Sequence, residues 1–332
     1  MAKTRNHVVP KFLLKQFAVD GHVMVVLRDG AQRPASIRSA AVEEHFYSFK
    51  DAEGRRLPLL EDYLDREVEN LAAPAIKRIV EGAYGHEDMS VAGRFLVFQL
   101  VRSPRFRTID IALAATIGPL LAGIDHVHAW KVGSPGAATA DDDTLAQVFE
   151  EGRANADGAY TSQPDANSHV RLLILTAERL LRDIEDVQWA LAVSDTPGFI
   201  TSDSPAVVFN PTIAEGGFAG FSAGSGNEFR LPLSPRHLLV GCRHHLGPTV
   251  FAATTELIAD TNRLLARECS HAIIVPPGLN PPGDPRPGKS PPTFPEPTVK
   301  ITASDSSEVS APSYPLIRDP QLRKIVERTY EV

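Results

Sequence analysis

The chain has 332 residues, of which 43% are hydrophobic and 23% are charged, and its formal net charge is −7. A chain of this length and composition forms one large soluble domain or two modest ones. Its two cysteines exclude a disulfide-rich scaffold and any multi-cysteine zinc or iron–sulfur site, and the acidic balance argues against a simple basic nucleic-acid binder.

The charge is unevenly distributed along the chain. Residues 1–110 carry a net charge of +2 and residues 111–332 a net charge of −9, while the windows 1–19, 94–107 and 229–255 contain basic residues and no acidic one. Such islands can focus a local field on an anion, or they can be solvated helix ends and loops. We find no apolar stretch long enough to span a membrane and no secretory signal, so we expect a cytoplasmic protein without a membrane segment.

The first half of the chain has mainly helical patterning. A short helix is expected after Pro10 and a strand in HVMVVLRDG, residues 22–30. The helical run 59–81 should be kinked or divided at Pro74, and a buried helix over 90–107 should break near Pro104. Further expectations are a second apolar segment (109–124), a loop (131–143), a cap at Asp143 and a helix (166–185).

The pattern then changes to short strands. Strands are expected at 188–193, 198–201, 206–209, 229–233, 237–242 and 271–275, with a helix at 255–268. We therefore predict an α+β fold in which a helical middle region packs on a mostly antiparallel sheet, followed by a Pro-rich C-terminal tail. The expected division is one catalytic or binding domain (1–275), a flexible Pro/Gly-rich segment (276–318) and a short terminal helix (319–332).

His7 is the first candidate functional residue. It stands just before the helix expected at Pro10, where the helix N-terminus would lower its pKa and an imidazole can act as a general base or contact an anion. The alternative is that His7 only caps a helix anchored by Phe12 and Phe17. An HxxP segment also occurs in the metal-binding hairpin of HNH-type nucleases, but the paired ligands of that hairpin are missing at usable spacing.

A glutamine and an arginine in the helix expected at 90–107 are the second candidates. Phe95, Gln99 and Arg102 fall on one stripe of that helix. A buried Gln and Arg are costly unless they meet partners. They therefore bind a carboxylate or phosphate, or they form a structural network with a buried acid, for which 61–69 is the candidate segment.

The third candidate is the hydroxyl-rich turn Thr201-Ser202-Asp203-Ser204 between two expected strands. These side chains could supply a nucleophile, a base or a clamp for an amine. An Asx-turn would explain Asp203 without any function. No nucleophile elbow, Walker loop or dinucleotide-binding glycine pattern is present.

Four motifs in this order resemble a known family. They are HxVPxFxLxxF at 7–17, FxxFQxxRSPxxR at 95–107, Trp189 before FITSDSP, and LPLSP at 231–235. The resemblance covers about residues 5–275 and points to a family long described as a domain of unknown function, widespread in bacteria and found in fungi. Its better understood members look like arginine-containing cyclodipeptide synthases, which take arginine from arginyl-tRNA and join it to a second aminoacyl group as a diketopiperazine.

The resemblance implies acyl transfer without a cofactor or a tightly bound metal, with aminoacylated tRNA as the partner. That reaction needs a base for the attacking amine, donors for the oxyanion and a carboxylate for the guanidinium. By chemical suitability we expect His7 as base, Asp203 as clamp and Ser202 or Ser204 as a possible acyl acceptor. The expected substrate-binding residues are Gln99, Arg102, Arg105 and Thr201, and the expected tRNA-binding residues are Lys11, Lys15, Arg107 and Arg236.

Two other function classes stay open at this point. One is a non-catalytic anion- or nucleic-acid-binding protein of regulation or defence, and the other is a metal-dependent nuclease. A cyclodipeptide synthase further predicts that His7, Gln99, Arg102 and Asp203 converge around one pocket, because catalytic groups must reach a shared substrate.

Overall fold

The structure is a computed structural model that describes residues 5–134, 137–155, 165–212, 227–243, 249–288 and 317–330. The chain divides into two compact units. The first comprises residues 1–107, 166–292 and 315–332, and the second comprises residues 108–165 and 293–314. The boundaries at 107/108 and 165/166 fall inside the range 1–275 that the sequence analysis treats as one domain.

The first unit contains two main sheets. In the five-stranded sheet, β12 (Val250–Ala252) pairs in parallel with β7 (Gln188–Val193), and the other neighbours are antiparallel. The order continues through β11 (His237–Cys242), β10 (Glu228–Ser234) and β9 (Val207–Phe209). The four-stranded sheet is antiparallel, in the order β3 (Gln32–Ser36), β2 (His22–Leu27), β13 (Ala272–Val275) and β8 (Thr201–Ser202).

Two short antiparallel ribbons complete the strands. They are β1 (Arg5–His7) with β4 (Val42–Glu44), and β5 (Phe49–Lys50) with β6 (Arg56–Leu57). The predicted α+β class with mostly antiparallel sheets is confirmed. The strand expected at 198–201 is shorter than predicted, because β8 begins only at Thr201.

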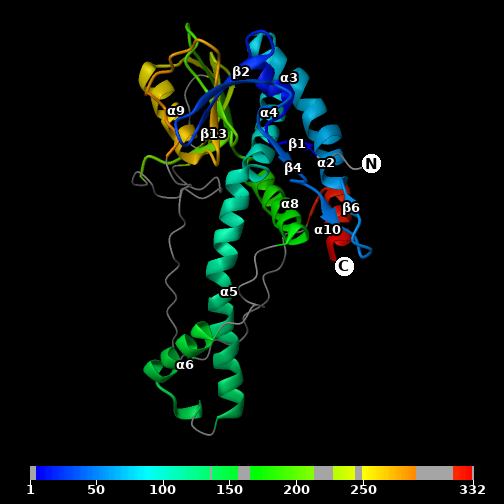
Figure 1. Ribbon diagram of the computed structural model, residues 1–332, viewed down its shortest axis with the longest axis vertical. Coiled ribbons are helices and arrows are strands. Elements are labelled where there is room, and N and C mark those ends of the chain that lie inside the picture. Colours follow the sequence, from blue (N-terminus) through cyan, green and yellow to red (C-terminus); the bar gives the residue numbers. More distant parts are fainter. Residues whose placement is uncertain are drawn as a thin grey trace. The chain divides into compact units, whose positions relative to one another are not determined.

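Helices flank the sheets of this unit (Figure 1). They are α1 (Lys11–Gln16), α2 (Leu59–Tyr63), the π-helix η1 (Leu64–Glu69), α3 (Asn70–Val80), α4 (His86–Val101), α8 (Ala166–Asp183), α9 (Thr255–Glu268) and α10 (Pro320–Tyr330). The helix α5 (Pro104–Gly133) begins in this unit and continues into the second, which also holds the 3₁₀-helix η2 (Ala137–Thr139) and α6 (Asp142–Ala154).

The helix α4 forms the centre of the first unit. Residues Phe95 to Val101 are all buried, as their apolar sequence predicts, and the helix packs against α3, α8 and the five-stranded sheet. It ends at Val101, and α5 begins at Pro104, which confirms the predicted break.

The run 59–81 is interrupted, but not at the proline. Pro74 lies inside α3, whereas the irregularity is the preceding π-helix η1. A second correction concerns α6, whose N-terminal cap is Asp141 and not Asp143: the Asp141 carboxylate accepts the N–H of Thr144 at 2.9 Å.

Part of the segment expected to be flexible contacts the fold. Asn262 of α9 donates to the carbonyl of Pro282 at 3.1 Å, and Arg28 donates to the carbonyl of Gly288. Residues 289–316 lie outside the described residues. The chain is described again from Ile317, and α10 buries Leu322 and Ile325 in the main core.

Candidate functional site

A cavity of about 580 Å³ opens between the β1–α1 region and the helices that follow residue 59. Its lining combines both signs of charge. Basic and imidazole side chains come from β1, α1 and the loop after β3, and carboxylates come from α2 and η1. The charged lining residues are Arg5, Lys11, Arg38, Glu61, Asp65, Glu69 and Arg102, and His7 adds its imidazole.

Arg102 joins the two sides of the cavity. Its guanidinium donates to Glu69 Oε1 at 2.6 Å and to the His7 carbonyl at 2.7 Å, and its Nε donates to the Tyr47 hydroxyl at 3.2 Å. The planar fork of arginine suits such simultaneous contacts. The network with an acid from 61–69, which the sequence left as an alternative, is therefore present, and Glu69 is that acid.

The acidic side is carried by α2 and η1. Glu61, Asp65 and Glu69 follow one another at intervals of four, and all three line the cavity. Residues four positions apart share one face of a helix, so the sequence itself places the three carboxylates on one side. Glu61 belongs to α2, and η1 carries Asp65 and Glu69.

His7 lies at the end of β1 with a half-buried ring that lines the cavity. Burial lowers the pKa of His7 below 6.5, the charge of Lys11 lowers it further, and hydrogen bonding with the Ile37 and Arg38 backbone opposes both. Its Nε2 is buried and has no hydrogen-bond partner among the described residues. The predicted lowering is confirmed, but burial is its main cause. A neutral imidazole of this kind can accept a proton.

Gln99 lies on the α4 face that also carries Phe95 and Arg102, yet it does not line the cavity. It is fully buried, and neither its amide oxygen nor its amide nitrogen has a partner in the described part of the chain. Phe95 packs on Phe12, whose side chain lines the cavity, with ring centroids 5.2 Å apart. Gln99 therefore stands behind the residues that face a ligand.

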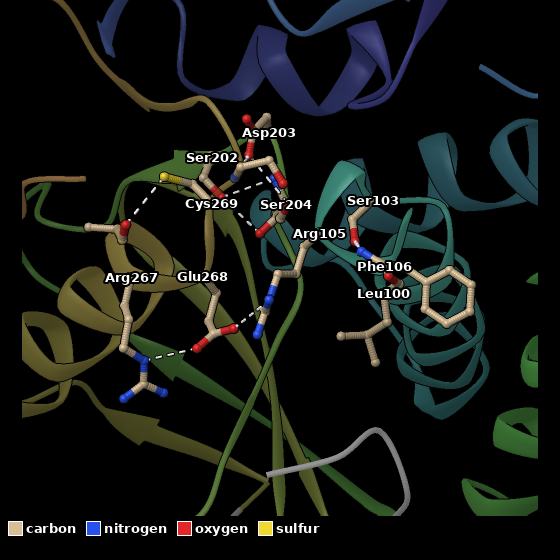
Figure 2. Close-up of polar contacts among 12 residues, drawn as sticks. Leu100, Ser103, Arg105, Phe106, Ser202, Asp203, Ser204, Arg267, Glu268 and Cys269 are labelled. Carbon is tan, nitrogen blue, oxygen red and sulfur yellow. Dashed lines mark hydrogen bonds and ion pairs between the residues drawn. The ribbon is translucent and has the colours of Figure 1, made fainter. Parts of the chain in front are cut away.

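The hydroxyl-rich turn is built into the protein interior. Figure 2 shows Ser202, Asp203 and Ser204 beside Cys269. The carboxylate of Asp203 accepts the backbone N–H groups of Ser270 at 2.8 Å, His271 at 2.5 Å and Ala272 at 3.1 Å. Burial raises the pKa of Asp203, and these three donors oppose the rise.

The hydroxyls of the turn are also bonded within the fold. Ser202 Oγ donates to the Ser204 carbonyl at 2.8 Å, and Ser204 Oγ donates to Asp203 at 3.3 Å. Thr201, Ser202, Asp203 and Ser204 are all buried, and none lines the cavity. Through these three backbone hydrogen bonds, Asp203 links the end of β8 to the start of β13. Of the four residues expected to converge, His7 and Arg102 line this cavity, and Gln99 and Asp203 do not.

The remaining predicted site residues are dispersed. Arg105 is buried and pairs with Glu268 of α9 at 2.9 Å, as Figure 2 shows. Arg107 lies over the Phe46 ring, 5.2 Å from its centroid, and Arg236 donates to the Asp195 carbonyl at 2.6 Å. Lys11 lines the cavity, whereas Lys15 is exposed at the other end of α1.

Sequence reasoning missed most of the cavity. Arg5 and Lys11 belong to a basic island that was recognised, but Arg38, Tyr47, Glu61 and Asp65 were not singled out. The regular spacing of Glu61, Asp65 and Glu69 was the one available signal. It was not decisive, since carboxylates at intervals of four also mark an ordinary solvated helix face.

The chain matches a protein family over residues 5–277. The chain belongs to DUF4238, a family described as a protein of unknown function. The match includes β1 and every residue that lines the cavity, and it ends before α10. No curated protein and no solved structure matches the chain. The family description assigns no activity, so the likeness to cyclodipeptide synthases rests on the sequence motifs alone.

Two absences concern the residues that the structure describes. No group of three or more His, Cys, Asp or Glu side chains there could hold a metal ion. Within the same residues, no helix has both the length and the apolar character needed to cross a membrane.

Proposed function

We propose that DUF4238 chains of this kind bind the aminoacylated end of arginyl-tRNA in the cavity and join its arginine to a second aminoacyl group as a cyclic dipeptide. The observation that carries the proposal is the charge of the lining, where Arg5, Lys11 and Arg38 come from one set of elements and Glu61, Asp65 and Glu69 from another. Phosphates of an acceptor end fit the cations, and an ammonium and a guanidinium fit the carboxylates.

The chemistry requires one base and no covalent enzyme intermediate. The α-amine of one aminoacyl group attacks the ester carbonyl of the other, and the C–O bond to the ribose breaks as the amide C–N bond forms. His7 takes the proton of the amine and returns it to the departing ribose oxygen. Attack of the second amine on the remaining ester closes the ring and releases the second tRNA.

The lining restricts the route that acyl transfer can take in this cavity. Among the residues that the structure describes, no Ser, Thr or Cys side chain lines the cavity, and the hydroxyls of Ser202 and Ser204 are bonded to the turn itself. Acyl transfer through a serine ester therefore has no acceptor in this site. Only direct aminolysis fits, and a protein that held aminoacyl-tRNA without a second substrate would use the same cavity.

The test incubates the full-length protein with tRNA charged with labelled arginine and with a second charged tRNA. We expect a new diketopiperazine by mass spectrometry, and His7→Gln should abolish it while charged tRNA still binds. The pH profile should fall on its acid side below 6.5, because the pKa of His7 is lowered and only the neutral ring accepts a proton.

The controls separate the two functions. Arg33→Ala removes an exposed cation of β3 outside the cavity and should leave product formation unchanged. Binding of arginyl-tRNA without any product would favour the binding protein. If the protein neither binds charged tRNA nor forms a diketopiperazine, the proposal fails.

A further inference from the structure

The C-terminal helix α10 is part of the unit that holds the cavity, although the family match ends at residue 277. It packs against α8 and α2, and its apolar face joins the main core. Its far end is held as well: Arg171 of α8 donates to the Thr329 carbonyl at 2.9 Å and lies over the Tyr330 ring.

Asp319 performs two tasks at the start of this helix. One oxygen, Oδ1, accepts the N–H groups of Gln321 at 2.8 Å and Leu322 at 3.3 Å and so caps α10. The other oxygen, Oδ2, accepts the hydroxyl of Tyr63 at 2.7 Å. Arg94 of α4 donates to the same hydroxyl at 2.9 Å.

Tyr63 is buried, and it is the last residue of α2, directly before η1. Burial raises the pKa of Tyr63, and its hydrogen bond to Asp319 raises it further, so the hydroxyl stays protonated and keeps donating at neutral pH. The π-helix that follows carries Asp65 and Glu69 into the cavity.

A π-helix is rare and occurs mostly as a single turn inside α-helices, frequently at functional sites, so contacts with its surroundings help to hold its form. At the C-terminal end of η1 that support is the ion pair of Glu69 with Arg102. At its N-terminal end the support is the hydrogen bond of Tyr63 to Asp319.

We propose that α10 positions the acidic side of the cavity: Asp319, through Tyr63, fixes η1 in the form that presents Asp65 and Glu69. Docking of α10 and binding of a ligand in the cavity are then coupled, and the coupling is reciprocal. The inference rests on the proposed function only for the identity of the ligand.

The first test is hydrogen–deuterium exchange on the full-length protein without ligand. In Tyr63→Phe and Asp319→Ala, the amides of 64–70 should exchange about tenfold faster, the factor that corresponds to a lost hydrogen bond to a charged group. Tyr63→Phe keeps the ring and the cap of α10, so it isolates the hydroxyl if Asp319→Ala undocks the helix.

Arg318→Ala is the matched control, because it removes the neighbouring ion pair with Glu185 (2.6 Å) and leaves Tyr63 untouched. Its exchange at 64–70 should equal that of the wild type. Equal exchange at 64–70 in all four proteins would overturn the inference, and so would an increase spread evenly through α4, which would mark general destabilisation.

The second test adds arginyl-tRNA to the wild-type protein. Exchange should slow both at 64–70 and at 320–330, and Tyr63→Phe should bind the tRNA several-fold more weakly. If the tRNA binds and leaves 320–330 unchanged, the coupling is wrong. If the tRNA does not bind, the proposed function fails, and the ligand-free comparison still decides the role of α10.

Discussion

Gln99 has a carboxamide that neither solvent nor any described residue satisfies. Both polar atoms are buried and without partners, on the α4 face whose neighbours contact the cavity. An unpaired buried polar group costs about 1–3 kcal/mol, and such groups are found where a ligand or a mechanism uses them. The buried amide of Gln99 should therefore lower the free energy of unfolding, and contact with a ligand is its candidate function.

Replacing Gln99 with methionine should separate that cost from that use. Gln99→Met keeps the unbranched shape and removes the amide, so the free energy of unfolding should rise by about 1–2 kcal/mol in urea denaturation. If the amide serves a ligand, the same variant should bind arginyl-tRNA more weakly. Leu96→Met reports the cost of methionine in this helix, and a Gln99→Met protein less stable than wild type would show that the amide has a partner.

Individual residues also show which contacts can be predicted from the sequence and which cannot. The apolar run of α4 predicts that Gln99 and Arg102 are buried. The sequence also offered an acid from 61–69 as the partner of Arg102, and the structure shows that this acid is Glu69. Asp203 could not be assigned in the same way. Its three donors come from residues 270–272, and only the folded chain brings that backbone to a carboxylate 67 positions away.

At the scale of elements, α4 and the five-stranded sheet are joined through the slot that holds Trp189. Gly93 of α4 and Gly241 of β11 form its two sides. A Cβ atom added at Gly93 would lie 2.4 Å from Trp189 Cζ2, and one at Gly241 would lie 2.3 Å from Cζ3. Both contacts are closer than any side chain tolerates, so the two glycines set the spacing between helix and sheet.

Gly93→Ala should therefore destabilise the protein, although it removes a glycine from a helix interior. Overpacking costs about 1–3 kcal/mol, which exceeds the roughly 0.5–1 kcal/mol gained in helix propensity. Trp189→Leu should cost less in the Gly93→Ala background than in the wild type, as a double-mutant cycle in urea would measure. Gly133→Ala, with no atom within 4 Å of the added methyl, is the control. If Gly93→Ala instead raised the free energy of unfolding, the close packing of Gly93 on Trp189 would be contradicted.

The sequence predicts the ends of helices where a local feature, such as a proline or a capping side chain, determines them. Pro104 starts α5 and Thr254 caps α9, with its hydroxyl 3.2 Å from the N–H of Leu257. The π-helix had no such signal, since an α- and a π-turn differ by one residue in hydrogen-bond spacing and share the same apolar residues.

The pair His271–Glu43 links the β13 sheet to the β1–β4 ribbon, with Nε2 3.6 Å from Oε1. The Glu43 carboxylate raises the pKa of His271 above 6.5. The pair therefore stabilises the folded state fully below pH 6.5, and this contribution disappears as the pH rises through the raised pKa. The His271 side chain is 69% exposed, so solvent screening keeps the contribution below about 1 kcal/mol.

His271→Gln should thus lower the melting temperature slightly at pH 6 and leave it unchanged at pH 9. Glu43→Gln should reproduce this pattern, and His22→Gln, at an exposed histidine of β2, should not. Equal effects of His271→Gln at both pH values would mean that packing, and not charge, is lost.

At the scale of the whole molecule, the cavity collects residues from β1 to the end of α4, and α10 supports it from the other end of the chain. Composition and periodicity gave the α+β class, because both are local properties summed along the chain. The separation of 108–165 as a unit of its own and the return of α10 to the core depend on long-range contacts, for which the sequence has no local signature.

The net charge of −7 and the small number of cavity cations together predict how binding depends on salt. Arg5, Lys11 and Arg38 can meet about three phosphates, so log K should fall with log salt at a slope of about −2 for a single-stranded acceptor end. Lys11→Ala should reduce the slope by about 0.7, and Arg33→Ala should leave it unchanged. A slope near −6 in filter binding would instead require a broad surface that includes Lys15, Arg107 and Arg236. The cavity alone does not offer enough cations for a slope of that size. The measured slope therefore distinguishes a site that binds one acceptor end from a surface that also binds the body of the tRNA.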